Sequence, residues 1–386
     1  KIDLGKSIHH YLPELVFDGS VDTKLISVEQ LLNHTHGIAT RKGIATWKTA
    51  FLGYSGKNKE LVDILNSNFR YDPSGKFRYS NLGPIIAALI AERVTGNSWK
   101  SEMKKRIFNP LKMKSTNSNV SDYRGDIRPA VSVASDGNVI RSGFYKKNIT
   151  MHAAGGTIST VLDLSNWLRA NMVQDKKLLG SDTAWKSLHN STTTQDRTFF
   201  SYKRYGYSLG WDLAKYQDDI ILTRFGGYAG ISFHLSFIPS RKIGIIAFSS
   251  DARAGGLPYL AANYAYNLVN PKVNAEEVFE DENKMFEKGF TRASSRASAN
   301  ITPLEQSDEN DKLIGTYENK AGWNTISITK KNSTYHMKWG VLEGSVYSRE
   351  HPRQPYVGSL GALSRSFGVE GDTLHTGSLV FERIKD

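Results

Sequence analysis

Tyr79 and Asn81 are the residues whose types and spacing most suggest acid–base chemistry. They stand in Phe77-Arg-Tyr-Ser-Asn81, between the turn residues Asp72-Pro-Ser-Gly75 and an apolar run that begins at Pro84. Two side chains two positions apart on such a loop can point into one cleft. A tyrosine hydroxyl beside a cation can give or take a proton, and an asparagine amide can orient a substrate. The tripeptide alone is common, and a turn that caps a helix is the simpler interpretation.

The histidines are weaker candidates. His34 and His36 have the spacing of a metal-binding pair, but no carboxylate or further histidine pattern completes a set of ligands, and we expect no metal. His152 precedes Gly155-Gly156, where the glycines predict a tight turn, and it is a candidate for lining a cleft. No glycine-rich nucleotide-binding motif is present, and we expect no cofactor.

Composition limits the classes of protein to consider. The 386 residues are 39% hydrophobic and 23% charged, as in a soluble globular protein with a sizeable core. Cysteine is absent, which excludes disulfides, thiolate zinc sites and cysteine nucleophiles. The net charge of +12 is spread along the chain, which favours a generic basic surface over nucleic-acid binding. No apolar run approaches the roughly 20 residues that span a bilayer.

The first 270 residues mix helices and strands unevenly, which indicates an α+β fold. Three helices are predicted from a capping box that starts at Ser27, from apolar residues at helical spacing between Ile85 and Val94, and from an N-cap at Thr160. Residues 233–237 and 243–248 predict two strands joined by a turn.

The composition changes near residue 270. Residues 271–311 are polar and charged, and we expect a linker there that includes a helix from Ala275 to Phe290. From residue 312 to 386, short alternating runs are separated by glycine turns, which predicts a small antiparallel sheet or barrel. The chain is therefore divided into a domain over residues 1–270, the linker, and a C-terminal β domain.

Several segments occur in an order and at a spacing that resemble one superfamily. They include ISVEQLLNHTHGI (26–38), FRYSNLG (77–83), AAGGTISTVLDLSNWL (153–168), YGYSLGWDL (205–213) and FGGYAGISFHLSFIPSRKIGIIAFSS (225–250). Over residues 1–268 the chain resembles the serine β-lactamase and penicillin-binding-protein superfamily, on the branch of class C β-lactamases, DD-peptidases, D-aminopeptidases and family VIII esterases. Residues 313–386 are similar to the lipocalin-like barrel that some members carry. The implied fold is an antiparallel sheet flanked by helices, with a helical lobe between about 50 and 150.

The resemblance implies a serine hydrolase that works through an acyl-enzyme. In this superfamily a Ser-x-x-Lys serine attacks the substrate, and the lysine and the tyrosine of Tyr-x-Asn handle its proton. The Tyr-x-Asn role falls on Tyr79 and Asn81. A Lys/His-x-Gly strand closes the site and supplies a backbone oxyanion donor. The residues implied for this strand are Phe225, Gly226, Gly227 and, as the oxyanion N–H, Tyr228.

The sequence departs from the family pattern at two points that affect the predicted nucleophile and substrate. The family's Ser-x-x-Lys pair precedes the segment with which this chain opens, and we expect it upstream of residue 1. The strings Ser101–Lys104 and Ser327–Lys330 are interpreted as incidental, the first on a surface helix and the second on a C-terminal strand. Phe225 stands where many relatives have Lys, His or Trp, and its ring cannot bind a substrate carboxylate. His375-Thr376-Gly377 resembles the missing motif but lies in the C-terminal module.

Two classes of function remain. The leading hypothesis is a serine hydrolase for D-amino-acid peptides, β-lactams or short esters, with no cofactor. The alternative is a non-catalytic binding or scaffolding protein that keeps the fold without the nucleophile. The family's usual setting is the periplasm or the cell surface, which makes cell-envelope peptidoglycan a candidate partner.

Overall fold

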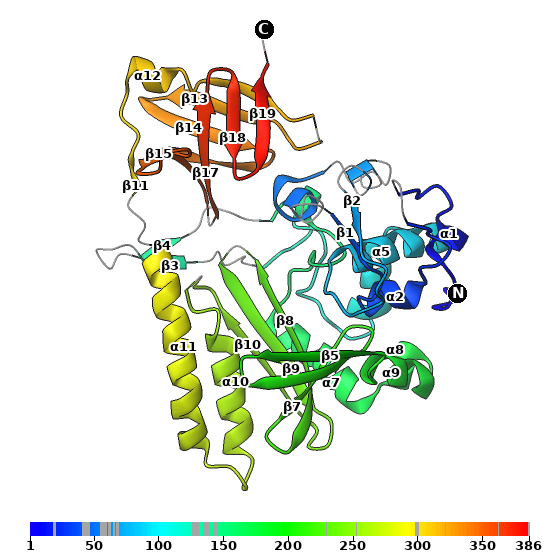
Figure 1. Cartoon of the computed structure of the whole chain (residues 1–386). Coiled ribbons are helices and arrows are strands. Elements are labelled where there is room, and N and C mark those ends of the chain that lie inside the picture. Colours follow the sequence, from blue (N-terminus) through cyan, green and yellow to red (C-terminus); the bar gives the residue numbers. More distant parts are fainter. Residues whose placement is uncertain are drawn as a thin grey trace.

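The chain folds into a helical lobe, a sheet covered by helices, and a C-terminal barrel (Figure 1). The computed structural model describes residues 1–17, 21–40, 47–54, 60, 63–64, 66, 69–125, 131–133, 139–141, 146–228, 230–251, 253–297, 301–320, 322–361 and 363–384. The α+β architecture with antiparallel sheets and a C-terminal barrel confirms the fold class predicted from the sequence.

The N-terminal lobe consists of short helices and two small two-stranded sheets, β1 with β2 and β3 with β4. Its elements are α1 (Ile8–Tyr11), α2 (Val28–Leu32), β1 (Ile38–Thr40), the π-helix η2 (Lys48–Leu52), β2 (Phe69–Tyr71), α5 (Leu82–Thr95), α6 (Trp99–Met103), the π-helix η3 (Lys104–Phe108), β3 (Val131–Val133), β4 (Val139–Arg141) and the 3-10 helix η4 (Asn148–Thr150). The lobe predicted between about 50 and 150 includes α5 and α6. Its segments 55–59, 126–130, 134–138 and 142–145 lie outside the described residues.

Local signals in the sequence account for the two principal helices of this lobe. The predicted capping box forms at α2, where the Ser27 side chain accepts from the N–H of Gln30 and the Gln30 side chain accepts from the N–H of Ser27. Helix α5 ends at Gly96, which takes the left-handed conformation at a φ of 69°. The two helices pack closely because Gly83 lacks a side chain, since a Cβ there would lie 2.0 Å from the carbonyl oxygen of Leu31.

The central sheet has six antiparallel strands in the order β10-β9-β8-β7-β6-β5. The strands are β5 (Thr193–Phe199), β6 (Tyr202–Tyr207), β7 (Asp212–Tyr216), β8 (Asp219–Tyr228), β9 (Ile231–Ile238) and β10 (Ile243–Ser249). The two strands predicted at 233–237 and 243–248 are β9 and β10, and they pair with each other as expected. Strand β8 pairs with β9 up to Tyr228 but with β7 only up to Thr223, so its last five residues extend past β7.

Helices cover both faces of the sheet. On one face, Leu213, Leu222 and Leu235 pack against Leu168 of α7 (Val161–Val173), and Trp211 belongs to the same core. On the other face, alternate residues of the same strands pack against α10 (Leu257–Leu268). The N-cap predicted at Thr160 is confirmed, because its side chain accepts from the N–H of Asp163. The short helices α8 (Lys176–Leu179) and α9 (Asp182–His189) follow α7.

The helix after α10 is longer than predicted. Helix α11 runs from Ala275 to Ala297 and lies alongside α10, whereas the sequence suggested an end at Phe290 and a linker beyond it (Figure 1). Alanine and arginine in the added segment favour helix, and extending an existing helix costs much less than nucleating a new one. Among the described residues, no helix combines the length and the apolar composition that crossing a membrane requires.

The C-terminal strands form a closed antiparallel barrel. Its strands are β12 (Gly315–Glu318), β13 (Ile326–Lys331), β14 (Thr334–Trp339), β15 (Leu342–Arg349), β16 (Tyr356–Leu360), β17 (Leu363–Glu370), β18 (Thr373–Thr376) and β19 (Leu379–Arg383). Pairing of β15 with β16 and of β12 with β19 closes the ring. Strand β11 (Ile301–Pro303) adds to β15, and α12 (Asp308–Asp311) precedes the barrel. Two motif-like segments that the sequence assigned to the C-terminal module lie in barrel strands. Ser327–Lys330 is part of β13, and His375-Thr376 is part of β18.

Candidate active site

Tyr79 and Arg224 form the centre of the candidate site. The hydroxyl oxygen of Tyr79 accepts a hydrogen bond from Nη2 of Arg224 at 3.1 Å, and the guanidinium carbon lies 5.2 Å from the centroid of the Tyr79 ring. Tyr79 is 42% exposed on the loop before α5, whereas the Arg224 side chain on β8 is 22% exposed. Because an arginine side chain stays charged at any ordinary pH, a fixed cation stands beside the Tyr79 oxygen and accounts for one of its hydrogen bonds.

A buried carboxylate holds this arginine in place. Oδ2 of Asp212 lies 3.3 Å from Nη1 of Arg224, and Asp212 is 2% exposed. Its other oxygen accepts from Nε2 of Gln195 at 3.0 Å and lies 3.6 Å from Nε of Arg204. Two cations and one anion therefore share this part of the sheet, which leaves an excess positive charge next to Tyr79.

His34 supports the loop that carries Tyr79. Its Nδ1 accepts from the N–H of Ser80 at 3.3 Å, its Nε2 lies 3.2 Å from the hydroxyl of Tyr207, and its ring centroid lies 4.5 Å from that of Tyr79. Burial first, and then the charge of Arg224, lower the pKa of His34 to about 3, so the ring is neutral. Since Nδ1 accepts, the hydrogen is on Nε2 and points at Tyr207. His34 is a structural support that the sequence did not single out for this role.

The histidine pair does not form a metal site with the described residues around it. Nδ1 of His36 accepts from the N–H of Ile38 at 3.0 Å, and burial lowers its pKa to about 4. Within the described ranges, no group of three or more His, Cys, Asp or Glu residues is placed to hold a metal ion. Both histidines instead bind backbone N–H groups beside the Tyr79 loop.

The side-chain amide of Asn81 makes no hydrogen bond to the described residues. It is the residue before α5 and takes a helical conformation, but its side chain makes no capping hydrogen bond. The N–H of Leu82 donates instead to Oγ of Ser80 at 3.2 Å. The neighbouring serine therefore caps the helix. If this loop were only a turn that caps the helix, the half-buried amide of Asn81 would be expected to make the capping bond, and it does not.

Phe225 lies away from Tyr79. Because consecutive residues of a strand point to opposite faces, Arg224 faces the lobe while Phe225 packs with the α10 side of the sheet. Its ring stacks on Phe199, with centroids 4.8 Å apart and planes 19° from parallel. The cation of the site is therefore Arg224, the residue before the Phe225-Gly226-Gly227 motif. In the sequence, the position of Arg224 next to this motif was the one sign of its role.

The two glycines of the motif have different surroundings. A Cβ on Gly226 would lie 2.1 Å from the ring of Phe233, so glycine there makes room for a neighbouring side chain. Gly227 is exposed, and a Cβ on it would meet only the carbonyl oxygen of Ile231 at 3.3 Å. In the described part of the chain, no strand pairs with the β7-side edge of residues 224–228. The oxyanion role of the Tyr228 N–H stays a prediction.

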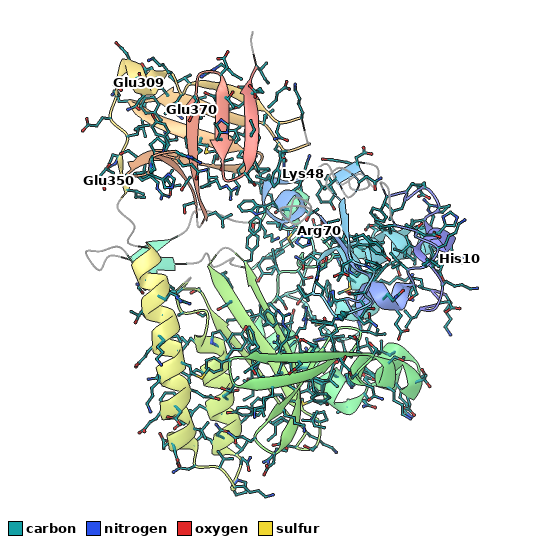
Figure 2. All side chains as sticks on the ribbon, in the orientation of Figure 1. His10, Lys48, Arg70, Glu309, Glu350 and Glu370 are labelled. Carbon is teal, nitrogen blue, oxygen red and sulfur yellow. The ribbon has the colours of Figure 1, made fainter. Side chains whose placement is uncertain are left out.

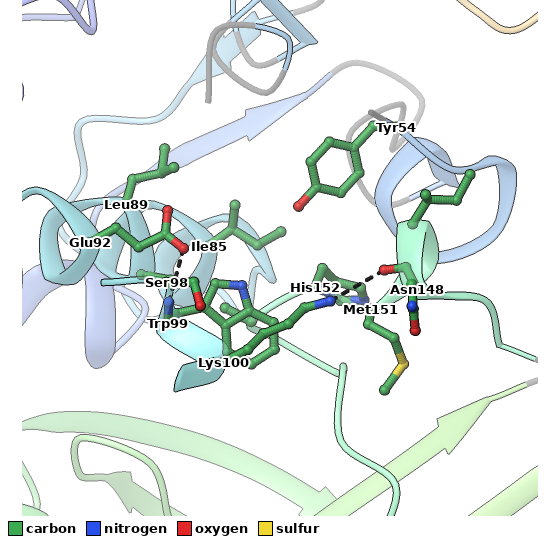
Figure 3. A pocket seen from close by; sticks show the side chains of 13 residues that line it. Tyr54, Ile85, Leu89, Glu92, Ser98, Trp99, Lys100, Asn148, Met151 and His152 are labelled. Carbon is green, nitrogen blue, oxygen red and sulfur yellow. Dashed lines mark hydrogen bonds between the residues drawn. The ribbon is translucent and has the colours of Figure 1, made fainter. Parts of the chain in front are cut away.

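His152 lies in a different place from the Tyr79 cluster. It lines a cavity of about 160 Å³ between α5, α6 and η4, together with Tyr54, Glu92 and Lys100 (Figure 3). Tyr79, Asn81 and strand β8 do not contribute to this lining. Burial and the charge of Lys146 lower the pKa of His152 to about 3, so it is neutral. The predicted tight turn after it forms, with the N–H of Gly155 donating to its carbonyl oxygen.

Lys146 is a further cation that the sequence did not single out. Its Nζ donates to the carbonyl oxygen of Thr150 at 2.9 Å and lies 4.1 Å from the centroid of the Tyr228 ring. Burial lowers its pKa from 10.5 to about 7. The amine is therefore only partly protonated at neutral pH, close to the end of β8.

The chain belongs to the beta-lactamase family, whose model matches residues 1–266. An unguisins hydrolase of Aspergillus campestris is 26% identical over 291 residues, which is 71% of this chain and 51% of that protein. Penicillin-binding protein 4* of Bacillus subtilis is 25% identical over 253 residues, covering 61% of this chain and 52% of that protein. The chain spans about half the length of the curated relatives it matches.

Solved structures of this fold include both penicillin-binding proteins and amidohydrolases. The octameric penicillin-binding protein homologue from Pyrococcus abyssi is 17% identical with a TM-score of 0.58, covering 98% of this chain and 82% of that one. This likeness shows the fold over nearly the whole chain. A D-stereospecific amidohydrolase from Streptomyces sp. is 25% identical with a TM-score of 0.54, covering 65% of this chain and 76% of that one.

Replacing Asp212 should destabilise the protein and release Arg224. Asp212→Asn keeps the shape but leaves two arginines without their shared anion, and we expect a loss of about 3 kcal/mol in the free energy of unfolding, measured with urea. The control is Asp281→Asn in α11, whose side chain is 75% exposed and pairs with Lys284 at 66% exposure, and for which we expect less than about 1 kcal/mol. If the free energy of unfolding falls by the same amount in the two variants, the buried Asp212 pair contributes no more to stability than an exposed pair.

Lys146 should make stability depend on pH. Because its pKa is about 7 in the folded protein and 10.5 in the unfolded chain, the unfolded state binds more protons between these values. The free energy of unfolding should therefore gain up to about 1.4 kcal/mol per pH unit in this window, and lose that gain as the pH falls to 7. Lys146→Met should flatten the profile, and the exposed Lys147→Met should not. Parallel profiles for the wild type and Lys146→Met would contradict the assignment.

Proposed function

We propose that this protein is a serine hydrolase that cleaves amide bonds of D-amino-acid derivatives through an acyl-enzyme. The observation that carries the proposal is the hydrogen bond from Arg224 to Tyr79, beside the edge of β8 that no described strand pairs with. Membership of the beta-lactamase family and the likeness to the D-stereospecific amidohydrolase support this choice of reaction. β-Lactams and short esters present the same acyl chemistry and are the other candidate substrates.

In the proposed reaction a serine hydroxyl attacks the substrate carbonyl, the amide C–N bond breaks, and the serine becomes an ester. The proton lost by the serine must reach the leaving nitrogen. The Tyr79 hydroxyl is suited to pass it on, since Arg224 already occupies a lone pair of its oxygen and fixes its direction. Water then attacks the ester carbonyl, which releases the acid and restores the serine.

The nucleophile is proposed to come from a segment before residue 1, as a Ser-x-x-Lys pair in the family's order. The two Ser-x-x-Lys strings of the sequence do not supply it. Ser101 lies exposed on α6, and Ser327 lies in strand β13 of the barrel, where its hydroxyl is 3.3 Å from that of Thr316. The lysine of the upstream pair would take the serine proton, and Tyr79 would deliver a proton to the leaving group.

The surroundings of Tyr79 favour an extended amide as substrate. Residues 224–228 of β8 have one edge that no described strand pairs with, and the main chain of an amide or peptide can hydrogen-bond there as an added strand. The uncommitted amide of Asn81 can bind the substrate's own amide group. The excess positive charge around Arg224 stabilises negative charge that develops on the substrate during acylation.

Acylation of the full-length protein tests this function. Incubation with a fluorophosphonate should form one serine–phosphonate bond with loss of fluoride, seen as a single adduct by intact-mass spectrometry. Tyr79→Phe should slow acylation by a D-amino-acid p-nitroanilide by about 10²- to 10⁴-fold, because it removes the proton donor. Tyr205→Phe, at a tyrosine that is 36% exposed on β6, is the matched control and should acylate at the wild-type rate.

One result would contradict the proposed reaction, and another would contradict only the role of Tyr79 in it. A full-length protein that folds but forms no adduct with either reagent is a binding or scaffolding protein of this family. If the D-amino-acid p-nitroanilide acylates the wild type and Tyr79→Phe at equal rates, the protein is still a serine hydrolase, but Tyr79 does not donate the proton to the leaving group.

A further inference from the structure

One short helix of the lobe is shared with the C-terminal barrel. Leu52 of η2 is 1% exposed and belongs to the hydrophobic core of the barrel. Trp47, the residue before η2, stacks on Trp339 of β14, with centroids 5.8 Å apart and planes 21° from parallel. Nζ of Lys48 donates to the carbonyl oxygen of Gly322 at 2.8 Å, at the junction between lobe and barrel (Figure 2).

The barrel also meets η2 through its backbone. Gly340, in the turn between β14 and β15, has a φ of 61°, and a Cβ there would lie 2.3 Å from the carbonyl oxygen of Leu52. The N–H of Val341 donates to the same oxygen at 3.0 Å. A backbone oxygen cannot turn aside as a flexible side chain can, so the fit between this turn and η2 is close and specific.

The same helix contacts the end of β8. The ring of Phe51 lies parallel to that of Tyr228, with centroids 5.3 Å apart and planes 6° from parallel. The carbonyl oxygen of Ala50 accepts from Nζ of Lys146 at 3.5 Å, and this ammonium lies over the Tyr228 ring. Tyr228 is therefore packed between groups whose positions depend on η2, and η2 depends on the barrel.

We propose that the C-terminal barrel is a positioning element for the substrate-binding end of β8, acting through η2 and Tyr228. The barrel turn fixes Leu52, the adjacent Phe51 supports the Tyr228 ring, and this ring sets the path of residues 224–228. Close packing transmits such a constraint because packed side chains deform little. The proposal rests on the proposed function in one respect, namely that residues 224–228 bind the substrate. The contacts between the barrel, η2 and Tyr228 do not depend on that function.

A pair of glycine variants in the full-length protein separates this role from general stability. Gly340→Ala pushes a Cβ against Leu52, whereas Gly371→Ala places one in another barrel turn with a φ of 58° and nothing within 4 Å. Both variants carry the same left-handed strain. Gly340→Ala should speed amide hydrogen exchange in residues 224–228 by about fivefold and slow acylation by the D-amino-acid p-nitroanilide by about tenfold. Gly371→Ala should leave both within about twofold of the wild type.

Phe51→Leu provides a second variant if Gly340→Ala fails to fold. It keeps an apolar side chain against the barrel but removes the stack on Tyr228, so it should change exchange and acylation in the same direction. Unchanged exchange in residues 224–228, or faster exchange with unchanged acylation, would overturn the positioning role. If the wild type itself is not acylated, the proposed function has failed, and the exchange measurement alone decides whether the barrel holds this strand.

Discussion

The buried carboxylate of Asp212 is the group on which the candidate site depends. It stands at the start of β7, opposite Thr223, where the pairing between β7 and β8 ends. An unpaired carboxylate at 2% exposure would be very costly, so it requires the cations that surround it. One of these, Arg224, reaches past the end of β7 to the Tyr79 hydroxyl. The contacts from Asp212 to Arg224 and from Arg224 to Tyr79 thus connect the sheet to the loop of the helical lobe. They also fix Arg224 at the start of the β8 edge that no described strand pairs with.

The remaining structure supports this connection from two sides. Within the lobe, neutral His34 holds the N–H of Ser80 and packs against the Tyr79 ring, so the loop cannot turn away from the sheet. At the far end of β8, η2 and the barrel pack against Tyr228. The part of β8 that extends past β7 is therefore held by charge at Arg224 and by packing at Tyr228, with exposed Gly227 between them. Rigidity of this kind suits a site that must align a carbonyl group with a nucleophile.

Local signals predicted much of the fold. The capping box at Ser27, the N-cap at Thr160 and the alternation of β9 each depend on a few neighbouring residues, and each is confirmed. The Tyr-x-Asn pair was a weak local signal, and its catalytic role was predicted from the resemblance of the surrounding segments to the family. Arg224 was missed, because its contact with Tyr79 joins residues 145 positions apart and depends on which strand residue faces the lobe. Lys146 and the barrel contacts of η2 were missed because tertiary packing alone creates them, and helix α11 was underestimated because its end lacks a strong stop signal.

The central claim is that Arg224 and Tyr79 together, and not Phe225, face the reacting group. A crystal structure of the full-length protein trapped as its phosphonyl adduct would test it most directly. The account predicts that the phosphonyl group lies within hydrogen-bond distance of the Tyr79 hydroxyl, that Arg224 still donates to that hydroxyl, and that the Phe225 ring remains stacked on Phe199. An adduct that contacts Phe225 while Arg224 is turned away from Tyr79 would contradict it.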